Sequence, residues 1–216
     1  NEKLLARVKS IYDKKEQLNL STEDAKLLED LYESFKANGA TLNKDDKEKY
    51  RKLSMDLSML TLQFDQNALK DKNRFELLIT DENELSGLPE SARDAAAMLA
   101  KSKDKNGWLF NLSAPSYIPF MRYSDKRDLR EKMYREYMSV GNKGDEFDNK
   151  DIIKKIVNIR LEIAQLMGFK NYAEYALEHT MAKNSANVYK LLNQLLEAYK
   201  PIAINEYNAV EGFALG

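Results

Sequence analysis

Apolar residues recur every three or four positions along most of this chain, which is the spacing of amphipathic helices. The clearest series predicts one long helix over residues 44–72, packed antiparallel against a neighbouring helix, and consists of Tyr50, Leu53, Leu57, Leu60 and Phe64. Other helices are expected over about residues 2–17, 22–37, 89–101, 125–140, 150–167, 172–178 and from Ser185 onward. The expected ends are marked by the caps Ser21, Asn149 and Asn171 and by the stops Asn38–Gly39 and Gly168.

The helical pattern breaks in the middle of the chain. Residues 75–80 and 108–112 are short apolar runs, rich in aromatic residues and bounded by turn residues, and we expect them to pair as two strands. Residues 114–120 contain two prolines and are expected to form a loop or a broken helical turn. The predicted fold is therefore mainly α: a multi-helix array over residues 1–216 with a small two-stranded β element, and a sub-boundary in the polar linker 141–148.

The last predicted helix has no stop signal. Its first half places Val188, Leu191, Leu192, Leu195 and Tyr199 inward, and Pro201 is expected to kink it. Apolar spacing continues from Ile204 to Phe213 and runs to Gly216, which predicts a chain cut inside a helix. The start at Asn1 has neither an initiator Met nor a signal-peptide core. We therefore expect a piece incomplete at both ends, able to self-associate through the exposed 204–213 face.

Composition narrows the functional classes. Lys plus Arg number 34 and Asp plus Glu 35, so no excess of basic charge favours binding to nucleic acid. The absence of cysteine excludes disulfides and thiolate zinc sites. No apolar run approaches the roughly 18 residues of a membrane span. These features fit a cytoplasmic protein, while a periplasmic one stays open if a leader preceded Asn1.

Residues able to hold a metal or act as acids and bases are few. The single histidine, His179, cannot complete a zinc site, which needs three or four ligands, and residue 176 is alanine where a Glu-x-x-His pair needs glutamate. His179 is therefore expected at a surface or helix end. Three acidic pairs lie in hydrophilic, lysine-rich stretches and are expected to be solvated faces or caps: Glu23–Asp24, Asp45–Asp46 and Asp145–Glu146.

Three aromatic residues near the prolines allow two interpretations. Tyr117, Phe120 and Tyr123 either line a peptide groove or anchor packing, and packing is the favoured interpretation. The sequence has neither a G-x-S-x-G nucleophile motif nor a glycine-rich phosphate loop. No catalytic, cofactor-binding or metal-binding residue is therefore predicted within the chain.

Several stretches, taken in order, resemble the thimet oligopeptidase and peptidyl-dipeptidase family of zinc metallopeptidases. They are LSMLTLQFDQNAL (57–69), LSGLP (85–89), RDLREKMYREY (127–137) and residues 156–173 with Arg160, Glu162, Ala164, Gly168, Phe169, Asn171 and Tyr172. The segment SAPSYIPFMRYSDKRDLREK (113–132) is most similar to the bacterial branch, which includes peptidyl-dipeptidases and oligopeptidase A.

The resemblance implies a helical peptidase whose two halves enclose a channel, with zinc held by an HExxH helix and a later Glu. One histidine cannot supply HExxH, so this chain would be a non-catalytic, amino-proximal section, a helical scaffold and part of the channel wall. The parent enzyme would bind zinc and hydrolyse short peptides, with release of carboxyl-terminal dipeptides favoured over internal cleavage. The alternative is a stand-alone helical interaction module that binds partners through the 152–166 stripe.

Overall fold

The computed structural model describes residues 2–215; Asn1 and Gly216, where the sequence predicts cut ends, lie outside the described residues. The fold is mainly α with one two-stranded sheet, as predicted. Contacts divide the chain into unit 1, which combines residues up to 56 with those from 158 onward, and unit 2, residues 57–157. The division falls inside two helices, α3 (Lys44–Arg74) and α7 (Lys150–Leu166).

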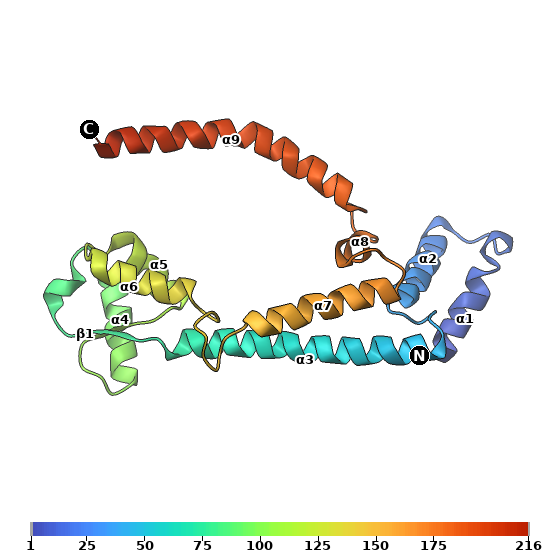
Figure 1. Cartoon of the computed structure of the whole chain (residues 1–216), viewed down its shortest axis with the longest axis horizontal. Coiled ribbons are helices and arrows are strands. Elements are labelled where there is room, and N and C mark those ends of the chain that lie inside the picture. Colours follow the sequence, from blue (N-terminus) through green and yellow to red (C-terminus); the bar gives the residue numbers. More distant parts are fainter. Residues whose placement is uncertain (1, 216) are drawn as a thin grey trace. The chain divides into compact units, whose positions relative to one another are not determined.

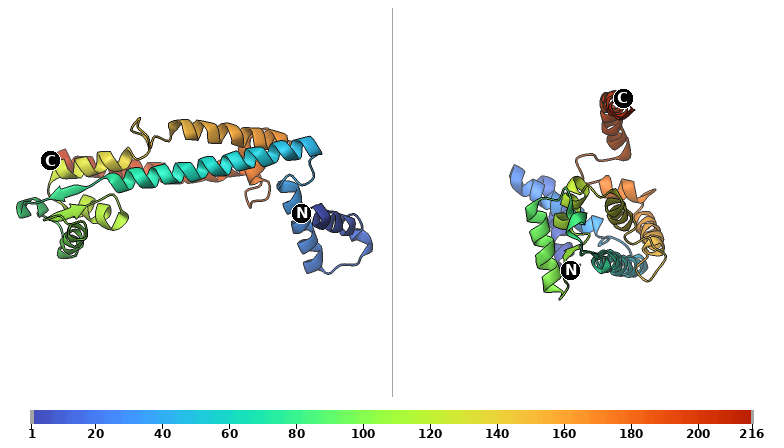
Figure 2. Two further views of the ribbon diagram at one scale, coloured as in Figure 1. Left: turned by 90° about the horizontal axis from the view of Figure 1, so that it is seen from below. Right: turned by 90° about the vertical axis from the view of Figure 1, so that its left-hand side faces the viewer.

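Unit 1 begins with a helical hairpin, which Figures 1 and 2 show as two neighbouring helices. It consists of α1 (Glu2–Tyr12), the 3-10 turn η1 (Lys15–Gln17) and α2 (Thr22–Ala37). Tyr12 stacks on Tyr32 with ring centroids 4.0 Å apart, which joins the two helices. The predicted cap is confirmed, because Ser21 Oγ accepts a hydrogen bond from the Asp24 N–H at 3.1 Å.

A short helix, α8 (Tyr172–Leu177), ties the later part of unit 1 to this hairpin. Its Asn171 cap is confirmed, since Asn171 Oδ1 accepts from the Glu174 N–H at 3.0 Å. The Tyr175 hydroxyl donates to the Ala37 carbonyl at 2.8 Å, at the end of α2. Burial raises the pKa of Tyr175 well above its ordinary value, so this hydroxyl remains a donor.

Unit 2 is built around the two predicted strands, which pair antiparallel with Leu77 opposite Phe110 and Ile79 opposite Trp108. Its elements are β1 (Leu77–Ile79), η2 (Glu82–Leu85), α4 (Glu90–Ser102), β2 (Trp108–Phe110), α5 (Ala114–Tyr123) and α6 (Arg127–Met138). Helix α4 packs against β2, and α5 packs against both α4 and α6. Ten buried side chains form the core: Phe75, Leu77, Ile79, Leu85, Leu88, Ala96, Phe110, Leu112, Phe120 and Met133.

The prediction of a loop or broken turn at 114–120 is wrong, because α5 covers these residues. Pro115 lies in the first turn, where an N–H has no partner inside a helix. Pro119 lies further into the helix and has no backbone N–H, so one hydrogen bond of α5 is missing there. Phe120 is fully buried and meets Phe110 edge to face, with ring centroids 4.8 Å apart, so packing offsets the missing hydrogen bond.

The last helix, α9 (Ser185–Leu215), is continuous through Pro201 and bends along its length (Figure 1). The predicted inward face is wrong for most of its members, because Leu191, Leu192, Leu195 and Tyr199 are exposed. Hydrophobic spacing places these residues on a face but does not supply a surface to cover them. Within residues 2–215, no helix is both long and apolar enough to cross a lipid bilayer.

Residues 139–149 connect α6 to α7 through a series of turns that contain two glycines with positive φ. The segment 141–148, where the sequence predicts a sub-boundary, lies inside unit 2, and a domain boundary there stays a prediction. Asn149 precedes α7, as predicted for a cap, but its side-chain oxygen and nitrogen both bond to α3. The connection is thereby fastened to α3, which positions the polar cluster described next.

Candidate functional site

His179, the candidate metal ligand named in the sequence analysis, lies at a helix end. His179 follows the end of α8 and is exposed, as predicted, with its Nε2 3.3 Å from Glu178 Oε2. In the part of the chain that the structure describes, no three His, Cys, Asp or Glu side chains are grouped so that they could hold a metal ion. The donor set of this chain therefore does not fit a zinc site of three or four ligands.

The acidic pairs lie where the sequence analysis placed them, on solvated faces and caps. Glu23 and Asp24 are in the first turn of α2, and Asp45 and Asp46 are in the first turn of α3. Carboxylates in a first helical turn are favoured by the unpaired N–H groups there. This arrangement supports helix starts rather than acid and base chemistry.

The three aromatics are split between core and surface. Phe120 lies in the core of unit 2, and Tyr117 stacks on Tyr137 with ring centroids 4.2 Å apart. Tyr123 is 46% exposed and lies beside the Arg122 guanidinium, 5.3 Å from the ring centroid. The packing interpretation is confirmed for the first two, and the three do not converge on a groove.

A buried carboxylate, Asp71, is the centre of a polar cluster in unit 2. Asp71 is 0% exposed, and its Oδ2 accepts the Gly141 N–H at 2.7 Å. Its Oδ1 lies 2.7 Å from Arg74 Nη2 and 3.1 Å from Lys143 Nζ. One buried charge is thus met by two cations and a backbone donor, which compensates its lost hydration.

Two more carboxylates extend the cluster to the surface. Lys143 Nζ lies 2.7 Å from Glu136 Oε2, and Arg74 also pairs with Asp145. Burial opposes the charge of Lys143, but hydrogen bonds to Glu136 and Asp71 outweigh it and raise the pKa of Lys143. The hydrogen bond from Arg74 lowers the pKa of Asp145. The cluster fastens the 139–149 connection to α3 through hydrogen bonds between charged groups.

Asn149 makes a second link to the same helix. Its Nδ2 donates to the Phe64 carbonyl at 3.0 Å, and its Oδ1 accepts from Asn67 Nδ2 at 3.1 Å. The Asn149 N–H donates to the Gly141 carbonyl at 2.7 Å, so the connection is closed at both ends. Asn67 and Asn149 are both buried, which is costly for an amide unless it is paired as it is here.

Sequence reasoning missed this polar cluster, although one signal was present. The predicted series ends at Phe64, but the same spacing of three and four continues to Asn67 and Asp71. These are the two residues of α3 that the structure buries. Polar residues that continue an apolar helical series are candidates for a buried hydrogen-bonded cluster.

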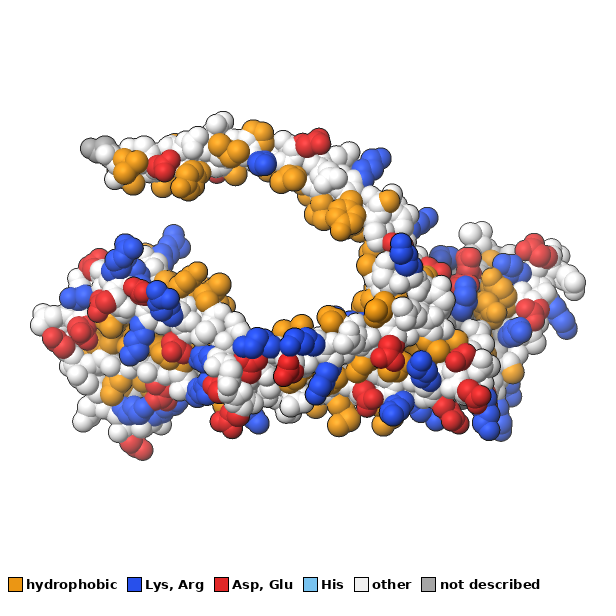
Figure 3. Space-filling model, viewed as in Figure 1, with side chains coloured by type: hydrophobic (Ala, Val, Ile, Leu, Met, Phe, Trp, Pro, Cys, Tyr) orange, Lys and Arg blue, Asp and Glu red, His pale blue; other side chains and the backbone are white. Residues whose placement is uncertain are grey.

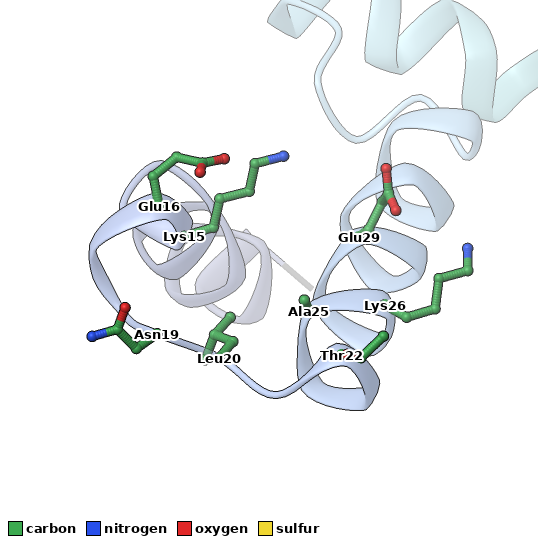
Figure 4. Close-up of a pocket in the computed structure, with 8 residues that line it drawn as sticks. All are labelled: Lys15, Glu16, Asn19, Leu20, Thr22, Ala25, Lys26 and Glu29. Carbon is green, nitrogen blue, oxygen red and sulfur yellow. The ribbon is translucent and has the colours of Figure 1, made fainter.

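Two cavities of the chain are candidates for binding sites. One, of about 620 Å³, lies between the η1 connection and α2 and is lined by Lys15, Glu16, Asn19, Leu20, Thr22, Ala25, Lys26 and Glu29. Figure 4 shows these side chains along the rim of an open hollow rather than converging on one point. The other, of about 220 Å³, lies between the alanines of α4 and the segment from β2 to α5, and is mainly apolar. Neither combines a closed shape with convergent polar groups.

Among the described elements, α9 has the most exposed large hydrophobic side chains. Figure 3 shows hydrophobic side chains along this helix. Its exposed residues include Leu195, at 43% exposure, and Tyr207, at 66%. Exposed apolar surface of this extent is typical of a face that another protein surface covers. The chain thus has a polar connection, 139–149, that is hydrogen-bonded to α3, and an exposed helix, α9. No grouping of catalytic side chains is found among residues 2–215.

Comparison with known proteins finds a family that this chain resembles. Residues 120–215 match the model of Peptidase family M3. Oligopeptidase A of Haemophilus influenzae is 36% identical over 197 residues, 89% of this chain, and that of Salmonella typhimurium is 34% identical over 218 residues, 99% of it. This chain is homologous to the M3 peptidases. Dipeptidyl carboxypeptidase of Escherichia coli, 30% identical over 212 residues and 98% of the chain, extends the relationship.

The resemblance seen in the sequence is therefore confirmed. The chain spans 29%, 32% and 31% of the length of these three relatives, so less than a third of each is matched. The M3 match includes the end of α5 and all of α6, α7, α8 and α9, and hence the 139–149 connection, whereas α3 lies outside it.

Proposed function

We propose that this chain is a non-catalytic, amino-proximal section of a zinc-dependent M3 oligopeptidase that hydrolyses short peptides. The observation that carries the proposal is the match to oligopeptidase A along 99% of the chain but only 32% of that relative. The section serves as helical scaffold and part of the wall around the substrate. Residues beyond this section supply the catalytic groups.

The chemistry of the chain supports this division of roles. Zinc polarises the peptide carbonyl and lowers the pKa of the attacking water when it is bound by a complete ligand set. The described residues do not provide that set. What they provide is a helical frame, in which Asp71 and Asn149 fix the connection before α7. We expect the 216-residue chain alone to bind zinc weakly and to cleave no peptide.

The relatives favour the oligopeptidase branch. Identity is 34–36% to the two bacterial oligopeptidases A and 30% and 26% to the dipeptidyl carboxypeptidases of Escherichia coli and Salmonella typhimurium. Cleavage of internal bonds is therefore the proposed mode for the whole protein. Release of carboxyl-terminal dipeptides, favoured in the sequence analysis, is the second candidate because those relatives match 98% of the chain.

We also propose a cytoplasmic location, and the names of two plant relatives bear on it. A relative from Arabidopsis thaliana, 36% identical over 95% of the chain, bears the name probable cytosolic oligopeptidase A. Another from the same plant, 35% identical, is described as chloroplastic and mitochondrial. Fractionation of the source cells, with the protein followed by antibody, tests this part of the proposal.

The decisive experiment uses the whole protein and amino-blocked short peptides, with products identified by mass spectrometry. Cleavage that stops with a chelator and returns with zinc supports the proposal, and the positions of the cuts separate internal cleavage from dipeptide release. Failure to cleave a varied peptide set would overturn the peptidase function and favour the interaction module. Stoichiometric zinc or cleavage in the isolated 216-residue chain would overturn its non-catalytic role.

A further inference from the structure

The chain contains two Asn-Gly steps, Asn38–Gly39 and Asn106–Gly107, which the structure places in opposite chemical situations. Asn-Gly is the step most prone to loss of the asparagine amide, because glycine has no side chain to hinder attack by its own backbone nitrogen. Asparagine is a thermolabile residue for this reason. We propose that Asn106 is a site of spontaneous deamidation and isoaspartate formation, and that Asn38 is protected.

Hydrogen bonds hold two groups that take part in the reaction at Asn38: the side-chain amide and the backbone nitrogen of Gly39. Its Nδ2 donates to the Ser34 carbonyl at 2.7 Å, which fixes the side-chain amide against the end of α2. The Gly39 N–H donates to the Lys36 carbonyl at 2.9 Å. Attack by the Gly39 nitrogen requires that both bonds break and that the helix end unwinds, which adds to the barrier.

Asn106 has none of these restraints. It lies between α4 and β2, and its side chain is exposed. Among the described residues, neither the Asn106 side chain nor the Gly107 N–H has a hydrogen-bond partner. The nucleophilic nitrogen and the reacting amide are therefore both free to meet, and no secondary structure must open first.

The reaction balances with water as its only co-reactant. The Gly107 nitrogen gives its proton to solvent base and attacks Cγ of Asn106, and the bond from Cγ to Nδ2 breaks as the amide leaves with a proton as ammonia. The resulting five-membered imide then adds water at either carbonyl. One opening gives aspartate and the other gives isoaspartate at position 106. Because the attacking nitrogen must lose a proton, the rate rises with pH.

The location makes the product consequential. Asn106 directly follows Lys105, which forms an ion pair with Glu76. Lys103 pairs with the same carboxylate, with its Nζ 2.6 Å from Glu76 Oε1. A new carboxylate at position 106 competes for these lysines. Isoaspartate also adds a methylene to the backbone directly before Gly107, whose Cα packs so closely that a Cβ there would lie 2.3 Å from the Ile79 carbonyl oxygen. We therefore expect isoaspartate to disturb the pairing of Ile79 with Trp108 more than aspartate does.

The test is incubation of the full chain in mildly alkaline buffer, followed by digestion and peptide mass spectrometry with enzymatic methylation to detect isoaspartate. Position 106 is expected to convert at least about tenfold faster than position 38, since a rate ratio of ten needs only about 1.4 kcal/mol of extra barrier at Asn38. The Asn106→Gln variant should lose most of the signal, and Asn38→Gln should keep it.

A denatured sample separates structure from sequence. In strong denaturant the two steps are expected to convert at similar rates, because the hydrogen bonds of Asn38 are gone. Equal rates in the folded chain, or faster conversion at Asn38, would overturn the proposal. An unchanged ratio between folded and denatured samples would overturn it as well, because the protection would then not come from the fold. Comparison of Asn106→Asp with the aged chain by thermal unfolding isolates the effect of the added methylene.

Discussion

The Gly141 N–H donates to the buried carboxylate of Asp71, with Gly141 N and Asp71 Oδ2 2.7 Å apart. The two residues are 70 positions apart in the sequence, and the bond fastens the connection between α6 and α7 to α3. Because Asp71 is fully buried, its charge depends on this donor and on the cations of Arg74 and Lys143.

Asp71→Ala is expected to lower the free energy of unfolding of the chain by about 3–5 kcal/mol. The variant leaves Lys143 and the Gly141 N–H in a partly buried place without the carboxylate that compensates them. Urea unfolding followed by circular dichroism measures the change. The control is Glu131→Ala, which removes an exposed pair with Arg135 and should cost no more than about 0.5 kcal/mol. Equal losses for both variants would show that the cluster does not stabilise the fold.

Asn149→Ala is expected to lower the free energy of unfolding by about 1–3 kcal/mol, because it leaves the buried Asn67 Nδ2 without its acceptor and removes a side-chain donor to the Phe64 carbonyl. The exposed Asn73 of the same helix α3 supplies the control, and Asn73→Ala should change stability by less than about 0.5 kcal/mol. Hydrogen exchange of the α7 amides adds a local readout. Faster exchange at the start of α7 is expected, and unchanged exchange would contradict the role of Asn149.

These two residues show how far sequence reasoning reaches. The apolar spacing of α3 predicts the helix and its inward face, because burying that face requires a period near 3.6. It does not predict that Asn67 and Asp71 continue the face, since their burial depends on partners about 70 to 80 positions away. The same limit explains α5, where the burial of Phe120 against Phe110 offsets the hydrogen bond that Pro119 removes. The sequence does predict the caps Ser21 and Asn171, because each accepts a hydrogen bond from a residue only three positions away.

The pKa of Asp148 is lowered from 3.8 to about 2, first by its hydrogen bond with the Lys150 side chain and then by the Lys150 N–H. A carboxyl whose pKa is lowered in the folded state stabilises the fold fully above its ordinary pKa. This contribution is lost as pH falls from about 4 to about 2. Carboxyl-carbon NMR titration of Asp148 measures the value directly. In Lys150→Met the pKa should move up toward 3.8, and an unchanged value would show that Lys150 is not the cause.

Gly87→Ala is expected to destabilise unit 2 by more than about 3 kcal/mol. The residue has φ +82°, and a Cβ there would lie 2.1 Å from the Tyr123 carbonyl oxygen, so backbone strain and a clash combine. Gly144→Ala is a matched control, because φ is +72° but no atom lies within 4 Å of the added Cβ. Gly144→Ala should lower the free energy of unfolding by only about 1–2 kcal/mol, which is the penalty for a non-glycine residue in the left-handed conformation. Thermal unfolding of both variants checks the difference, and similar midpoints would contradict the close approach at Gly87.

Self-association of the isolated chain through α9 is the last expectation. Leu195 and Tyr207 are exposed on this helix, and burial of such side chains is worth about 1.5–3 kcal/mol each, enough to favour a dimer at high protein concentration. Sedimentation velocity over a range of concentrations should show a reversible increase in mass. The double variant Leu195→Glu, Tyr207→Glu should remain monomeric, whereas Gln194→Glu adds a charge to the same helix without removing apolar surface and should still associate. Monomers at every concentration, or association that survives the double variant, would rule out α9 as the contact.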